Sequence, residues 1–144
     1  NRIAELPSFV FDMNSLVRLN LHDNQLVALD SSIGKLNNLE FLDLGRNKLN
    51  DVPFLGNLES LEYLNLSNNE LTKAPDISLS GKLRTTNLSF NQIEEVPEWM
   101  AELPEKSTVY LHNNAITEVP EFIFGMTLRK VSLKGNKIRT LPKI

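Results

Sequence analysis

The sequence has no cysteine, only two histidines and no long apolar run. Without cysteine it can form no disulfide, no thiolate zinc site and no cysteine nucleophile, and this composition favours a reducing compartment. No stretch approaches the roughly 18 apolar residues of a membrane-spanning helix, and no basic and apolar leader stands at the start. We therefore expect a cytoplasmic chain that does not insert into membranes.

The net charge is also small, and catalytic motifs are missing. Fifteen lysines and arginines against 18 aspartates and glutamates give a formal net charge of −3, which offers no general reason for nucleic-acid binding. The six glycines are scattered and form no phosphate-binding loop, and no serine stands in a nucleophile elbow. These absences favour a non-enzymatic protein without a metal or another cofactor.

Leucine and asparagine are abundant instead, with 25 and 17 copies among 144 residues. Seven of the asparagines recur at intervals of 22 or 23 residues: Asn1, Asn24, Asn47, Asn69, Asn91, Asn114 and Asn136. A regular interval of this kind indicates a repeat architecture.

Each asparagine belongs to the pattern L-x-x-L-x-L-x-x-N-x-L, as in Leu16, Leu19, Leu21, Asn24 and Leu26. Six full copies begin near residues 16, 39, 61, 83, 106 and 128, after a partial copy at the N-terminus. The chain resembles the leucine-rich repeat family over its whole length. Its Leu-Pro and Val-Pro pairs are similar to the intracellular type with 22 to 23 residues per repeat. The resemblance implies an α/β solenoid, a curved right-handed coil that forms one domain over residues 1–144.

The physical chemistry of one copy predicts the same architecture. Apolar residues at pattern positions 4 and 6 alternate with polar ones, which indicates a short strand with one buried face. Stacking the copies gives these faces a common core and a parallel sheet. The recurring asparagines should bond to the backbone of adjacent turns inside the stack. The prolines that follow predict short helical or irregular return segments on the convex side, with the sheet on the concave side.

The fourth and fifth copies depart from the pattern. Ser80 stands where Leu36 and Leu58 stand in other copies, and Leu79 is displaced by one residue. Thr86 stands at a core strand position, and Lys106 stands at the first leucine position of the fifth copy. The chain also begins and ends inside a repeat without capping segments, so we expect it to be a section of a longer protein. The uncapped ends also allow self-association of the chain as a further alternative.

The strand positions that face solvent provide the candidate binding surface. Phe41 and Tyr63 should be neighbours on adjacent strands, and Phe90 and Tyr110 should lie further along. His22 is expected near Asp23 or Asp43, and about 19 Å from His112, too far for the two histidines to share a metal. The candidate partner-binding residues are Arg18, His22, Phe41, Asp43, Tyr63, Phe90, Tyr110 and His112.

Exposed aromatic side chains with a polar rim are typical of protein-binding patches, whereas aromatic pairs can also simply stiffen a sheet. The glutamates of repeats four and five and the basic residues of the last repeat either orient a charged partner or form a solvated face. We predict a protein-binding module of intracellular signalling or scaffolding, with no nucleic-acid partner. The alternative is a regulatory or substrate-docking segment of a larger kinase, GTPase or ubiquitin ligase.

Overall fold

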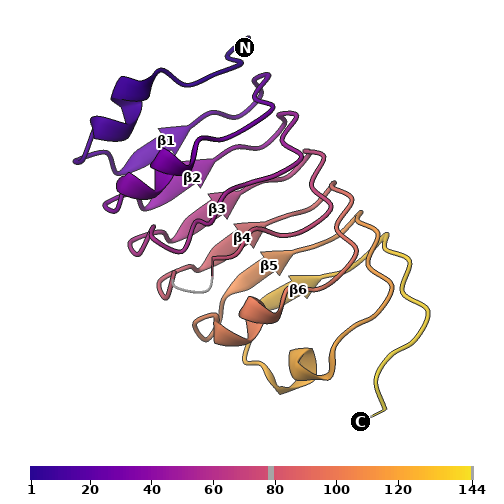
Figure 1. Ribbon diagram of the computed structural model, residues 1–144. Helices are drawn as coiled ribbons and strands as arrows, with labels where there is room; N and C mark the ends of the chain where they lie inside the picture. Colours follow the sequence, from indigo (N-terminus) through magenta and orange to yellow (C-terminus); the bar gives the residue numbers. More distant parts are fainter. Residues whose placement is uncertain (78–79, 144) are drawn as a thin grey trace.

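The computed structural model describes residues 1–77 and 80–143 as a stack of similar coils (Figure 1). Each of the last six coils contributes one short strand to a parallel sheet, in which sequence neighbours are also sheet neighbours. The strands are β1 (Arg18–Asn20), β2 (Phe41–Asp43), β3 (Tyr63–Asn65), β4 (Thr85–Asn87), β5 (Thr108–Tyr110) and β6 (Lys130–Ser132). The predicted solenoid with an open parallel sheet on its concave face is confirmed.

The strand register follows the repeat position by position. Phe41 pairs with Tyr63, and Leu42 pairs with Leu64. The middle residue of each strand points into the core: Leu42 and Leu64 are fully buried, and Thr86 at the same place is only 1% exposed. Their flanking residues therefore point to the concave side of the sheet, because successive side chains on a strand point to opposite sides.

The return segments contain four short 3-10 helices among the described residues. They are η1 (Ser8–Asp12), η2 (Ser31–Lys35), η3 (Glu98–Glu102) and η4 (Glu121–Gly125). A proline in extended conformation precedes all of them except η2. Asp30 takes that place before η2, and its carboxylate accepts a hydrogen bond of 2.7 Å from the Ser32 amide, which lowers the pKa of Asp30. The predicted helical or irregular return segments are present.

The repeated asparagines form the predicted internal ladder. Asn47, for example, is 8% exposed and donates to the carbonyl oxygens of Leu21 and Leu44, each at 3.0 Å. Its own side-chain oxygen accepts the amide of Leu26 at 3.0 Å. Each such side chain thus links its own coil to the preceding one, and it satisfies backbone groups that no strand partner reaches.

Two serines explain how the irregular fourth and fifth coils stay closed. Ser80 and Ser107 are 3% and 2% exposed, and their hydroxyls donate to the carbonyl oxygens of Leu58 and Leu83 in the preceding coils. The displaced Leu79 lies outside the described residues. Ser107, not Lys106, provides the buried side chain at the start of the fifth coil. Lys106 is exposed and adopts a left-handed backbone with φ 64°.

Candidate functional site

Three side chains of β1, β2 and β3 form one continuous stack on the solvent side of the sheet. The rings of Phe41 and Tyr63 lie parallel, with centroids 4.5 Å apart and planes 4° apart. The Arg18 guanidinium lies 4.0 Å from the centroid of the Phe41 ring. The predicted contact between the two rings is confirmed. Burial raises the pKa of the Tyr63 hydroxyl, and the negative charge of Asp43 raises it further.

A polar cluster lies beside this stack. The Asp43 carboxylate oxygen Oδ1 meets His22 Nδ1 at 3.1 Å, the Asn65 amide at 3.0 Å and the Gly45 backbone amide at 2.9 Å. Asp43, rather than Asp23, is therefore the aspartate that His22 contacts. A methyl group at Gly45 would stand 2.7 Å from His22 Nδ1 and 2.8 Å from the Asn65 amide nitrogen, so the glycine leaves room for both side chains.

Gly45 and Asn65 were not among the residues predicted for the site. Both belong to columns of equivalent residues on the concave side of the sheet. In the column of Gly45, the next coil has Ser67. The signal that could have identified them is the lone glycine in a column of side chains, next to an aspartate and a histidine. A missing Cβ at that point permits a close approach that other repeats do not allow.

A second aromatic cluster lies on the coils of β4, β5 and β6. The His112 ring meets Phe90 edge to face at 5.4 Å and Tyr110 at 5.9 Å, and the Lys130 ammonium lies 5.1 Å from the Tyr110 ring. His112 Nδ1 is buried without a hydrogen-bond partner. Burial, and then the charges of Lys130 and Lys134, lower the pKa of His112. The neutral imidazole is thus the favoured form.

The eight predicted site residues divide between two clusters, with Phe90 and Tyr110 further along the sheet from Phe41 and Tyr63 as expected. Arg18, His22, Phe41, Asp43 and Tyr63 make the first, while Phe90, Tyr110 and His112 belong to the second. Between them, β4 carries short polar side chains such as Thr85 and Asn87. Within the described residues, no group of three or more histidine, cysteine or acidic side chains is placed to hold a metal ion.

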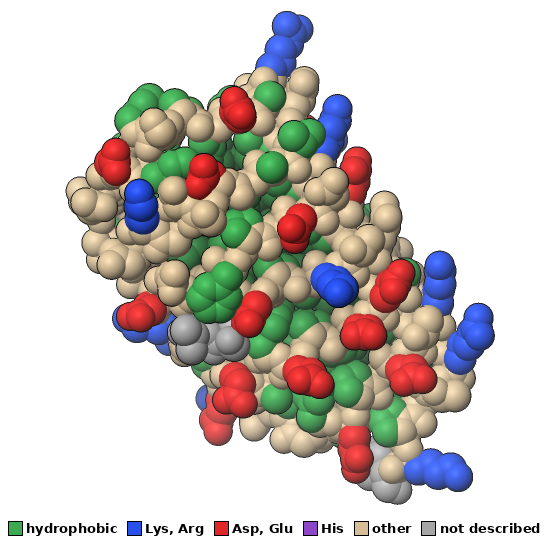
Figure 2. Space-filling view, in the orientation of Figure 1, with side chains coloured by type: hydrophobic (Ala, Val, Ile, Leu, Met, Phe, Trp, Pro, Cys, Tyr) green, Lys and Arg blue, Asp and Glu red, His purple; other side chains and the backbone are tan. Residues whose placement is uncertain are grey.

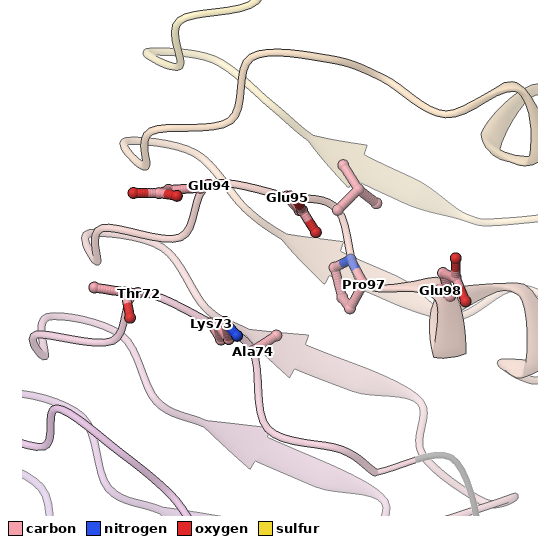
Figure 3. Close-up of a pocket in the computed structure, with 8 residues that line it drawn as sticks. Thr72, Lys73, Ala74, Glu94, Glu95, Pro97 and Glu98 are labelled. Carbon is pink, nitrogen blue, oxygen red and sulfur yellow. The ribbon is translucent and has the colours of Figure 1, made fainter.

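The face that carries the return segments has a different character. A hollow of about 540 Å³ lies between two successive coils, lined by Thr72, Lys73, Ala74, Glu94, Glu95, Val96, Pro97 and Glu98 (Figure 3). Acidic side chains alternate with hydrophobic ones over this part of the face (Figure 2). The hollow has one lysine against three glutamates, so its field is negative.

A family model described as leucine-rich repeats, in two copies, matches residues 14–57 and 37–81. Its matched stretches contain the same leucine and asparagine positions that build the core and the ladder. The chain belongs to the leucine-rich repeat family. No curated protein sequence matches this leucine-rich repeat chain significantly.

Solved structures of leucine-rich repeat proteins superpose on nearly the whole chain. The functional domain of InlJ from Listeria monocytogenes, which includes a cysteine ladder, is 22% identical over 97% of this chain and 29% of its own, with a TM-score of 0.79. A leucine-rich repeat protein of Leptospira interrogans is 27% identical over 99% of this chain and 43% of its own, with a TM-score of 0.72. This chain thus spans less than half the length of either protein.

A third neighbour was solved with a partner. The ectodomain of the Arabidopsis thaliana membrane receptor kinase GASSHO1/SCHENGEN3, in complex with Casparian strip integrity factor 2, is 27% identical with a TM-score of 0.78. It covers 94% of this chain and 17% of the receptor chain. Leucine-rich repeat domains are typically protein–protein interaction modules. In the part of our chain that the structure describes, no helix is both long and apolar enough to cross a membrane.

Proposed function

We propose that this leucine-rich repeat domain binds a protein partner through its concave face, as a non-enzymatic module of intracellular signalling or scaffolding. The observation that carries the proposal is the Arg18, Phe41 and Tyr63 stack, in which flat side chains on three successive strands remain partly open to solvent. Rigid aromatic anchors of this kind lose little conformational entropy when a partner covers them. The absence of cysteine is the argument for a cytoplasmic location.

Phe90 argues against a purely structural role for the aromatic residues. It lies after β4, outside the strands, with 49% of its surface exposed and a left-handed backbone at φ 54°. That conformation costs a bulky residue about 1–2 kcal/mol. The left-handed turn itself belongs to the repeat, because Asp23, Arg46, Asn68, Asn113 and Gly135 hold the corresponding places with φ between 53° and 73°. Part of the Phe90 ring contacts His112, and its exposed half is open to a partner, which cross-strand stiffening does not require.

The Arabidopsis neighbour supports a partner-binding role, because the same fold is seen there in complex with another protein. That neighbour also favours the second candidate function, in which the domain is a regulatory or docking segment of a larger enzyme. A catalytic domain identified in the full reading frame, with activity altered by added domain in trans, would select this alternative.

The test compares two pairs of alanine substitutions for partner capture and for stability. Phe41→Ala with Tyr63→Ala removes the stack. Phe54→Ala with Phe124→Ala is the matched control, since these two rings are 42% and 49% exposed on the return segments. Removal of two anchors should weaken partner binding at least about 30-fold, while the control pair leaves it within a few-fold.

The same variants must be followed by thermal unfolding. A loss of binding in the first pair that greatly exceeds its loss of stability supports recognition by the concave face. Equal loss of thermal stability and binding, or equal binding by the two pairs, would show that the stack only stiffens the sheet.

A further inference from the structure

The concave side of the last three strands carries charge of one sign. Lys130 and Lys134 occupy solvent-facing columns, while Arg84 and Arg129 directly precede β4 and β6. All four are exposed. Neither β4, β5 and β6 nor their solvent-facing columns contain an acidic residue. This half of the face is therefore positive, although the chain as a whole carries a formal charge of −3.

These cations take part in no ion pair among the described residues. The ion pairs within the described residues join His22 to Asp43 and Arg46 to Asp23, and none includes a basic residue of the last three coils. The acidic residues of the same coils lie on the other side, where Glu94, Glu95 and Glu98 line the outer hollow. These glutamates follow β4, whereas the exposed Lys137 and Arg139 follow β6. The concave lysines are therefore available to an outside anion.

The positive side chains surround the second aromatic cluster. The Lys130 ammonium already lies over Tyr110, and the edge of His112 joins Tyr110 to the exposed ring of Phe90. A partner side chain that packs on these rings would come within reach of the lysines. Burying that contact would exclude water from the pairs and strengthen their attraction.

We propose that the β4–β6 half of the concave face, defined by Phe90, Tyr110, His112, Lys130 and Lys134, binds an acidic peptide segment of the protein partner. Carboxylates of the segment pair with Lys130 and Lys134, and an apolar side chain beside them packs on Phe90 and Tyr110. This inference rests on the proposed function, and it adds the chemistry that the partner must present. An extended segment of about four residues spans the roughly 10 Å that the two spacings between β4 and β6 provide.

Nucleic acid fits this surface less well than a protein segment. The positive patch covers half of the concave face, and Glu94, Glu95 and Glu98 line the outer side of the β4 coil, where they would repel a polyanion. A short acidic peptide can satisfy the lysines without extending over that outer side.

The test selects binders from a library of random 12-residue peptides displayed against the intact domain. The selected peptides are then measured with Lys130→Gln plus Lys134→Gln, and with Lys35→Gln plus Lys48→Gln as the control of equal charge. Both control lysines are exposed; Lys35 lies in η2 and Lys48 follows β2. Aspartate and glutamate should be enriched in the selected peptides. Affinity should fall about tenfold in the first variant only, and added salt should reduce that difference.

Each other outcome overturns the inference in a distinguishable way. Peptides that lose binding with Phe41→Ala and Tyr63→Ala, but show no acidic enrichment and no effect of the Lys130 and Lys134 changes, would leave the proposed function standing alone. If no selected peptide loses binding with the Phe41 and Tyr63 pair or with the Lys130 and Lys134 pair, both proposals are contradicted. A single-stranded oligonucleotide that binds as tightly as the peptides, and loses binding in the same lysine variant, would replace the protein segment with nucleic acid.

Discussion

Replacing Asn47 with alanine tests the internal ladder that holds successive coils together. The Asn47 amide donates to the carbonyl oxygens of Leu21, Leu44 and Gly45, and its oxygen accepts the amide of Leu26. Alanine removes all four hydrogen bonds and leaves the buried backbone without its inter-coil link. We expect the free energy of unfolding to fall by about 3 kcal/mol.

This magnitude follows from what each former partner retains. The carbonyl oxygens of Leu21 and Leu44 keep donors from neighbouring ladder asparagines, at 3.0 Å each, and that of Gly45 keeps the Asp23 amide at 2.9 Å. These lost bonds therefore cost roughly 0.5 kcal/mol each, at the low end of the usual range. Among the described residues the Leu26 amide has no other acceptor, and Leu26 is only 1% exposed, so leaving this amide unpaired costs about 1–3 kcal/mol.

Urea unfolding followed by Trp99 fluorescence measures the difference, with Asn50→Ala as the control. Asn50 is exposed, and its substitution should change stability by less than about 0.5 kcal/mol. A decrease of 3 kcal/mol corresponds to a melting temperature lower by roughly 6–12 °C for a chain of this size. If Asn47→Ala and Asn50→Ala were equally stable, the hydrogen bonds of Asn47 would not contribute to the free energy of unfolding as we expect.

Three further perturbations probe the concave face. Gly45→Ala should push the His22 ring away from Asp43, which would appear as altered His22 ring resonances in NMR spectra; an unchanged His22 spectrum would contradict the close contact. Phe90→Asn should stabilise the domain by up to about 1 kcal/mol in urea unfolding, since asparagine tolerates the left-handed backbone, and it should weaken partner binding; loss of stability would contradict the strain. The pKa of His112 in the folded domain lies below the ordinary 6.5, so the unfolded chain binds this proton at a higher pH than the folded domain does. The neutral imidazole therefore favours the folded state above pH 6.5, and this stabilisation is lost as the pH falls through the lowered pKa of the folded domain. An NMR titration midpoint of His112 at or above 6.5 would refute the shift.

Much of the fold follows from residue spacing. The distance of 22 or 23 residues between asparagines places equivalent residues opposite one another, so the pairing of Phe41 with Tyr63 could be predicted. The ladder could be predicted as well, because an amide side chain can both donate to and accept from the backbone at a turn that strands do not reach.

Other features depend on local geometry that the repeat does not encode. The left-handed conformation of Lys106 shifts the buried position at the start of the fifth coil by one residue, to Ser107. The room that Gly45 leaves for His22 and Asn65, and the edge-to-face contact of His112 with Phe90, also escaped the sequence, because both depend on side-chain orientation. Side-chain direction, unlike repeat register, is set by contacts between particular neighbours.

Hydrogen–deuterium exchange of the domain with and without a bound partner tests partner recognition by the concave face most directly. The account predicts new protection along the strands and the residues that follow them, from 18–22 around β1 to 130–134 around β6. The return segments, including residues 94–98, should exchange as in the free domain. Protection confined to residues 94–98 and their neighbours, with unchanged exchange in the strands, would contradict it.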